Sequence, residues 1–258
     1  MLNITISDLN MMTAFWLVFS RWVAILIQLP LFDQVSVPML VKILMAVMIS
    51  YGFFPMISSE VMLDVTKYAD SFWVLTTFYT LSGLLIGYFV RSLMSIFTAA
   101  GSIITQQIGF GAIRYFDPTS AEQVGPFEQI IQWTMLIIVI SSGALIPMFK
   151  GVHISFMTVN LHSMKDFSTI TPYFIDMFKG LFMSSLLLAT PLIFINMLIM
   201  AVLGIISKAV PQLNIIMVSF VLNIGLGLLI FAASSNEFFY VAFQKYTDHL
   251  GKWFQYII

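Results

Sequence analysis

Long apolar segments separated by polar connections run through the whole chain. A bilayer core of about 30 Å takes roughly 20 helical residues to cross, and six segments are long enough. They lie near residues 11–32, 38–57, 71–90, 128–149, 180–206 and 213–235. The pattern predicts an all-α, polytopic membrane-assembly protein. Because no internal repeat and no Pro/Gly-rich linker divides the chain, residues 1–258 are expected to form a single domain.

Polar connections and a mixed tail complete the pattern. The connections are residues 34–38, 58–70, 91–127, 150–179 and 207–212. Within the longest of them, residues 92–108 can continue as a helix. The tail, residues 236–258, combines aromatic and charged residues and predicts an amphipathic or interfacial helix rather than a seventh span.

Composition supports a membrane protein and excludes several kinds of function. The chain is 60% hydrophobic and 9% charged, whereas soluble domains carry about 25% charged residues. A net charge of −1 gives no electrostatic basis for nucleic-acid binding. The chain has no cysteine, and its three histidines lack metal-ligand spacing. No carboxylate lies in the middle of a predicted span, so neither a catalytic site, a metal site nor a cofactor is predicted.

Several predicted spans carry polar residues, of which Arg21 in the first, Asn196 in the fifth and Asn223 in the sixth are the candidates for buried polar contacts. A charge at a helix centre costs about 2.5–3.5 kcal/mol on insertion scales. Arg21 is therefore expected either to face protein, water or a headgroup, or to extend its side chain to an interface. The two asparagines predict interhelical hydrogen bonds, with a polar pathway as the alternative.

Gly83 and Gly87 form a small-xxx-small pattern in the third apolar segment. Glycines at this spacing lie on one face of a helix and let a second backbone approach closely. The pattern predicts helix packing and no narrower function.

The central loop, residues 105–122, combines a permissive backbone with large apolar side chains. Gly109 and Gly111 free the backbone, and Pro118 biases Asp117 away from the helical region. An aromatic loop is costly in water, and non-helical backbone at membrane depth is tolerated only inside protein or beside a watery cavity. Two interpretations stay open: an interfacial loop with ordinary packing, or a plug that fills a channel and moves aside. The candidate plug residues are Gln106, Gln107, Ile108, Gly109, Phe110, Gly111, Arg114, Tyr115, Phe116, Asp117 and Pro118.

A polar, helix-breaking stretch from Leu203 to Asn214 joins the last two apolar segments. Between such segments, this concentration of polar residues indicates either a solvated turn or a subunit contact. The candidate residues are Gly204, Lys208, Pro211, Gln212 and Asn214.

Taken in order, these residues resemble the FliR family of bacterial export-gate subunits, which has flagellar members and counterparts in virulence injectisomes. The resemblance covers nearly the whole chain, and its most specific motif is Pro-Gln-Leu-Asn at residues 211–214. The other residues that carry it are Ala189 to Pro191, Asn196, Leu203 to Val210, Ser219 and Phe220, Arg21 with Pro30 and Pro38, Gly101 to Pro118, and Gly151 with His153.

The chain departs from the family at three positions. Gly83 and Ser102 stand where members often carry glutamate, so acidic contacts with partner subunits are not expected there. Lys208 replaces the commoner arginine and lacks its bidentate geometry.

The resemblance implies a non-enzymatic structural and gating subunit of a type III export gate, at the flagellar basal body in the bacterial inner membrane. It implies bent helical hairpins that assemble with P-type and Q-type subunits, and with the B-type switch subunit as a further partner. Residues 106–119 would be the plug, and Pro211, Gln212 and Asn214 would form a turn recognised by neighbouring subunits. The gate would pass unfolded protein substrates and contact membrane lipid, without nucleic acid.

Two alternatives are kept. The first is the homologous subunit of a virulence injectisome. The second, from another class, is a six-span secondary transporter or small-molecule channel with a binding site near the membrane midplane.

Overall fold

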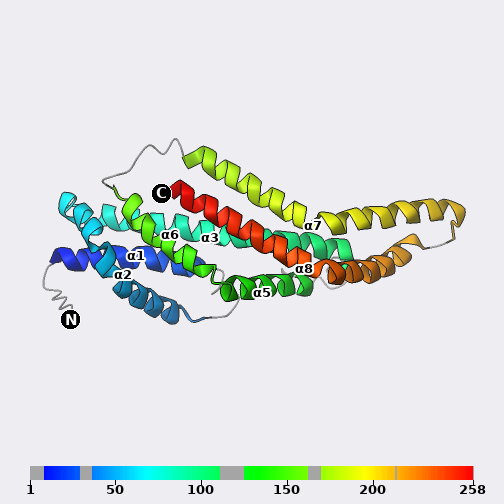
Figure 1. Ribbon diagram of the computed structural model, residues 1–258, viewed down its shortest axis with the longest axis horizontal. Coiled ribbons are helices and arrows are strands. Elements are labelled where there is room, and N and C mark those ends of the chain that lie inside the picture. The colour runs from blue at the N-terminus through cyan, green and yellow to red at the C-terminus, as the bar shows by residue number, and fades with distance from the viewer. Residues whose placement is uncertain (1–8, 30–36, 111–124, 162–169, 213, 258) are drawn as a thin grey trace. The chain divides into compact units, whose positions relative to one another are not determined.

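The computed structural model describes residues 9–29, 37–110, 125–161, 170–212 and 214–257 (Figure 1). All the regular structure in these ranges is helical. The helices are α1 (Leu9–Gln28), α2 (Met39–Lys67), α3 (Phe72–Ile108), α5 (Pro126–Ser141), α6 (Leu145–Thr158), α7 (Ile170–Ala209) and α8 (Ile215–Ile257). Within the described ranges, five helices are long and apolar enough to cross a membrane, and the pair α5 and α6 together makes a possible sixth. The predicted all-α, polytopic class is confirmed.

Two predicted connections are wrong. The expected connection at residues 58–70 is too long: α2 continues to Lys67 with Val61, Asp64 and Val65 facing the core, and only residues 68–71 separate it from α3. Likewise, residues 150–179 contain most of α6 and the first turns of α7. In both places polar residues lie within a continuing helix, and a count of apolar residues alone assigns them to a loop.

Two predicted segments have other boundaries. The apolar run at 128–149 is broken between α5 and α6, where Gly143 has a φ of 73°, a backbone conformation that favours glycine. The tail at 236–258 is not a separate helix, because α8 runs without interruption from Ile215 to Ile257. Glu237 therefore lies inside a helix long enough to span a membrane.

The chain forms two compact units. The first contains Met1–Met94, Ala144–Pro172 and His249–Ile258, and the second contains Ser95–Gly143 and Tyr173–Asp248.

In the first unit, α1 packs on α2, and the first half of α3 crosses α1 at the two glycines. A Cβ atom on Gly83 would lie 2.6 Å from the carbonyl oxygen of Arg21, and one on Gly87 would lie 3.1 Å from the Cα of Ile25. These distances leave no room for a side chain, so the predicted close packing at the glycine pair is confirmed. A glutamate at position 83 would not fit this approach.

In the second unit, one stripe of α8 packs on the second half of α3. The stripe repeats about every four residues, as one helix face does. Its buried members are Ser219, Asn223, Gly227, Phe238, Ala242 and Tyr246. Phe97 of α3 meets Tyr246 with ring centroids 6.1 Å apart, and Ile108 meets Gly227.

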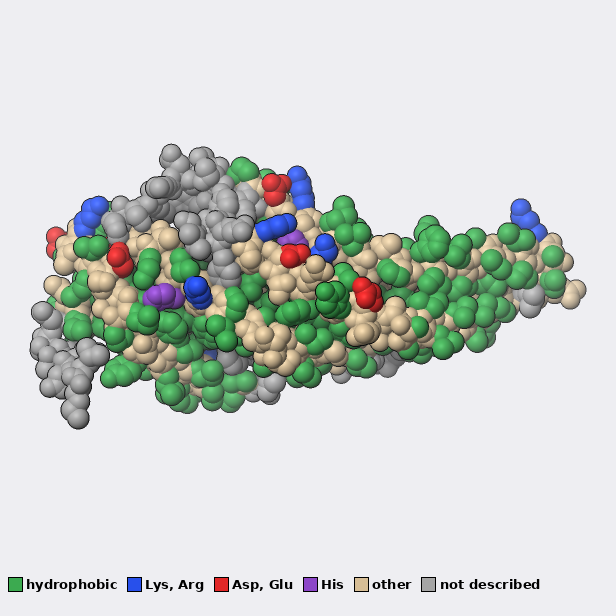
Figure 2. All heavy atoms as spheres, viewed as in Figure 1, with side chains coloured by type: hydrophobic (Ala, Val, Ile, Leu, Met, Phe, Trp, Pro, Cys, Tyr) green, Lys and Arg blue, Asp and Glu red, His purple; other side chains and the backbone are tan. Residues whose placement is uncertain are grey.

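Most of the surface of α2, α7 and α8 is apolar and exposed. Only 22%, 22% and 17% of their most apolar windows are buried, against 61% for α3. Hydrophobic side chains cover much of the hairpin formed by α7 and α8 (Figure 2). A helix that is apolar all round belongs in lipid or against other polypeptides.

Candidate functional site

The end of α3 fixes the start of the central loop. Ile108 is fully buried, and a Cβ on Gly227 of α8 would lie 3.0 Å from the Ile108 side chain. Gly109 follows with a φ of +98°, and its N–H donates to the Gln106 carbonyl at 3.1 Å. The chain turns here in a conformation that a residue with a Cβ rarely adopts.

A chain of aromatic rings joins the two sides of residues 111–124. Phe110, just before them, stacks on Phe127 in the first turn of α5, with centroids 6.3 Å apart. Phe127 in turn meets Phe231 of α8 edge-to-face at 4.8 Å. Such ring pairs contribute about 0.5–1.5 kcal/mol beyond their buried area. The residues that enter and leave this segment are therefore held at one place on α8.

Asn196 of α7 and Asn223 of α8 both lie beside the carboxyl end of α3. The Asn196 amide donates to the main-chain carbonyl of Gln107 at 3.0 Å and also to the Gln107 side-chain oxygen, which links α7 to α3. Asn223 is buried beside Gly109, and no group in the described part of the chain donates to its side-chain oxygen. The other plug candidates, Gly111, Arg114, Tyr115, Phe116, Asp117 and Pro118, lie outside the described residues.

The turn between α7 and α8 is exposed in the single chain. Its candidate contact residues, Gly204, Lys208, Pro211, Gln212 and Asn214, are all exposed. The Asn214 side-chain oxygen accepts from the Met217 N–H at 3.4 Å, in the manner of a helix N-cap. A Cβ on Gly204 would meet nothing within 4 Å. These residues therefore lie at the end of a hairpin, away from the packed stripe of α8.

Arg21 is fully buried at the end of α6. Its two terminal nitrogens donate to the carbonyls of Ser155 at 3.0 Å and Val159 at 2.9 Å. The guanidinium carbon also lies 4.5 Å from the Tyr79 ring centre and 4.4 Å from that of Phe156. A cation at the carboxyl end of a helix is favourable because the last carbonyls carry partial negative charge. Arg21 thus faces protein and does not extend to an interface.

Asp64 completes this buried cluster from α2. One of its carboxylate oxygens accepts from the Tyr79 hydroxyl at 2.9 Å and from the Leu161 N–H at 3.1 Å. Asp64 and Tyr79 are themselves fully buried. The Arg21–Asp64–Tyr79 cluster therefore ties α1, α2 and α3 to the end of α6. We expect its loss to be costly, because a buried charge without its partners is strongly destabilising.

Sequence reasoning missed two carboxylates in apolar helices. Asp64 lies in the predicted connection 58–70, and Glu237 in the predicted tail. Both helices are long and apolar enough to span a membrane, with Asp64 in the last turn of α2 and Glu237 well inside α8, so each acid belongs to a candidate span that the sequence segments did not include. For Asp64, the four-residue spacing of Ile57, Val61 and Val65 marks a continuing helix face and could have revealed it.

Comparison with known proteins gives the family. The chain matches Bacterial export proteins, family 1, over residues 12–249. It is 31% identical to Flagellar biosynthetic protein FliR of Borreliella burgdorferi over 151 residues, 57% of this chain and 56% of that protein. It is 27% identical to Flagellar biosynthetic protein FliR of Bacillus subtilis over 239 residues, 91% of each chain. It is 25% identical to Surface presentation of antigens protein SpaR of Shigella sonnei over 158 residues, 61% of each chain.

Several helices are long and apolar enough to cross a membrane. In one unit a buried ionic cluster holds them together, and in the other most of their apolar side chains are exposed. These features define a polytopic helical membrane protein. The chain belongs to the bacterial export proteins, family 1. The resemblance to the FliR family is thereby confirmed.

Proposed function

We propose that the chain is a structural, non-enzymatic subunit of a flagellar type III protein export gate in the bacterial inner membrane. It assembles there with P-type and Q-type subunits and with the B-type switch subunit, and it contacts unfolded substrates in transit. The observation that carries the export role is the family match over residues 12–249. This match does not favour the transporter alternative.

The proposal assigns gating to residues 106–119, with Gly109 as the hinge. Support comes from the anchored base of this segment, where Phe110 and Phe127 stack and Phe231 holds them. Because Phe110 and Phe127, the residues on either side of it, are in contact, residues 111–124 could move without displacing α3 or α5. The left-handed conformation of Gly109 supports a turn at the start of that movement.

The test removes residues 111–124 and joins Phe110 to Gly125 through a short Gly-Ser linker. The proximity of Phe110 and Phe127 lets such a linker close the gap without strain. A larger deletion that removed Ile108 would also remove the contact with Gly227 and confuse the result. We expect the complex with P-type and Q-type subunits to assemble normally and to conduct ions in a planar bilayer when the wild-type complex is closed.

The matched control is a Gly-Ser segment of unchanged length in place of residues 111–124. It preserves the spacing but lacks apolar side chains, and it is expected to leak as well. Unchanged conductance in both variants would contradict the plug assignment, and failure of the wild-type chain to assemble would contradict the gate assignment.

The matches also include an injectisome protein, so the export system is a separate question. The flagellar relative of Bacillus subtilis aligns over 91% of the chain and the SpaR protein over 61%, which favours the flagellar system. Restored motility, without restored virulence secretion, in deletion strains carrying this chain is the expected result.

A further inference from the structure

Glu237 is a charged residue in an unusual place. It lies inside the candidate span Ile215–Lys252 of α8, and its side chain is exposed. In the described part of the chain, no cation lies within ion-pair distance of it. An unpaired carboxylate on the outside of an apolar membrane helix is costly. Its surroundings in the assembled state must therefore differ from those in the isolated chain.

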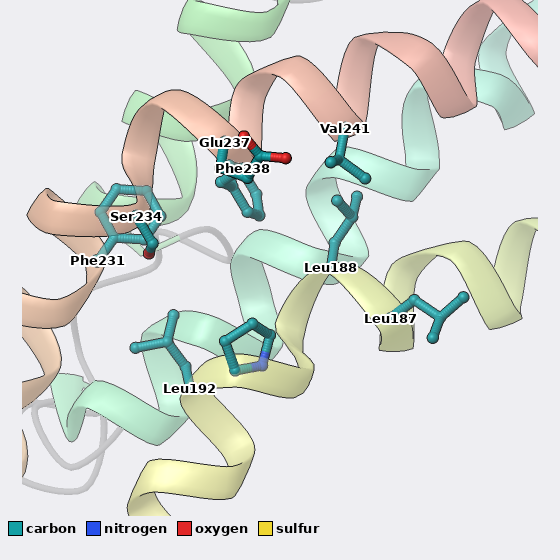
Figure 3. A pocket seen from close by; sticks show the side chains of 9 residues that line it. Leu187, Leu188, Leu192, Phe231, Ser234, Glu237, Phe238 and Val241 are labelled. Carbon is teal, nitrogen blue, oxygen red and sulfur yellow. The ribbon is translucent and has the colours of Figure 1, made fainter.

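Glu237 stands beside a small apolar pocket between α7 and α8 (Figure 3). The pocket has a volume of about 150 Å³. Leucine side chains of α7 and phenylalanine side chains of α8 form most of its wall, and Pro191 of α7 also lines it. It is large enough for one side chain and too small for a folded segment.

The polar groups of this pocket are acceptors. Pro191 has no N–H, so the carbonyl of Leu187, one turn earlier, lacks its helical donor beside the proline ring. The Ser234 hydroxyl donates its proton to the Ile230 carbonyl at 2.8 Å. The carboxylate of Glu237 accepts only, when ionised. An apolar wall with acceptors at its edge fits a cation on an aliphatic stem.

We propose that this pocket receives a lysine or arginine side chain from an apolar helix of another export-gate subunit. The aliphatic stem of that side chain packs against the leucine and phenylalanine wall, and its charged head pairs with Glu237. The proposal rests on the proposed function only for the identity of the partner as a gate subunit. The pairing neutralises a charge on each helix at once, so each helix is stable in the membrane only when the two are together.

The first experiment compares Glu237→Gln with Asp248→Asn after co-expression with the P-type and Q-type subunits and extraction in mild detergent. Asp248 is a second exposed acid on α8 and is the matched control. Glu237→Gln is expected to weaken the association by at least about tenfold, because the partner's cation is left without its counter-charge. Asp248→Asn is expected to leave it unchanged. Equal behaviour of the two variants overturns the proposal.

The second experiment identifies the occupant. A photo-crosslinking amino acid replaces Val241, which lines the pocket, and is activated in living cells. The expected adduct lies within about one helical turn of a lysine or arginine in an apolar segment of another subunit. An adduct to lipid alone, or to a second copy of this chain, overturns the proposal. If the wild-type complex does not assemble, the proposed gate function fails, whereas the adduct still reports what fills the pocket.

Exchanging the charges of Glu237 and its partner residue tests whether the two pair directly. Glu237→Lys should abolish the association, and replacing the crosslinked cation by glutamate should restore it. Failure of the exchanged pair, while the single Glu237→Gln change weakens association, would contradict direct pairing.

Discussion

Arg21 in α1 and Glu237 in α8 are both charged residues in helices long and apolar enough to cross a membrane. Arg21 is fully buried, donates to two carbonyls of the first unit and lies between two aromatic rings. Glu237 is exposed and has no cationic partner in the described ranges. The first charge stabilises the fold of its own unit. The second has its counter-charge, we propose, on another polypeptide.

The residues around the two charges also differ, polar around Arg21 and mostly apolar around Glu237. The last carbonyls of α6 accept from the two terminal nitrogens of Arg21, and the buried Asp64 carboxylate of α2 accepts from Tyr79, whose ring lies against the guanidinium. Around Glu237, most side chains of α7 and α8 are apolar and uncovered. A buried charge whose counter-charge lies in the same chain contributes to folding, whereas a charge without one can pair with a charge on another subunit. Four substitutions test this comparison.

Arg21→Met should have the largest effect. It removes the hydrogen bonds to Ser155 and Val159 and leaves Asp64 buried without a neighbouring cation, at a cost of about 3–5 kcal/mol. Unfolding of the purified chain in detergent, followed by tryptophan fluorescence, measures it. Arg21→Lys should recover only part of the loss, because lysine lacks the planar fork. Lys252→Met, at an exposed lysine of α8, is the control, and an equal loss there would contradict the cluster's role.

Tyr79→Phe should come second. It keeps the ring over Arg21 but removes the 2.9 Å hydrogen bond to the Asp64 carboxylate, which is expected to cost about 1.5–3 kcal/mol. The same unfolding measurement applies. Tyr51→Phe removes a hydroxyl from an exposed residue of α2 and should have no effect. In Arg21→Met, the further effect of Tyr79→Phe should differ from its effect in the wild type, since the two groups share one cluster.

Gly83→Ala should destabilise by about 1–3 kcal/mol, because the new methyl group meets the backbone of α1 and only a shift of the helices relieves it. Gly52→Ala places the same group in α2 with nothing within 4 Å. That control should be neutral or stabilising, since alanine favours helix. Equal behaviour of the two alanine variants in detergent unfolding would show that α3 does not pack closely on α1 at this position.

Glu237→Gln should have the smallest effect on the isolated chain, with an unchanged apparent unfolding temperature. The exposed carboxylate makes no contact in the described structure that the amide would lose. Its effect should be seen only on association with other subunits. A large loss of stability in the isolated chain would mean that Glu237, like Arg21, serves the fold of its own unit.

The class of fold could be predicted from the sequence because it depends on local properties. Apolar runs of helical length and scarce charges require helices in a membrane setting, whatever packs against them. The spacing of Gly83 and Gly87 likewise predicts a close helix contact without naming the partner. Helix boundaries were less predictable, because α2 and α8 continue through polar residues that face a single side.

The candidate site could be predicted only in part. Gly109 was expected to free the backbone, but its contacts with α8 depend on residues more than a hundred positions away. Asn196 was expected to bond between helices, and tertiary structure alone identifies Gln107 as its partner. Asp64 was missed because it was placed in a connection, and Glu237 because it was placed in a separate tail helix and not in a span.

By itself, the sequence determined the all-helical membrane class, the family resemblance, the close-packing glycines and the absence of cysteine chemistry. These follow from amino-acid composition, from the spacing of apolar and glycine residues and from the order of motifs, all of which can be read along the chain. Tertiary structure decided that Arg21 binds carbonyls 134 and 138 residues away and that Asp64 accepts from Leu161. It also decided that Glu237 has no counter-charge among the residues that the structure describes. The reason is physical: the energy of a buried charge depends on the groups that folding brings within a few ångströms, and their distance along the chain does not determine it.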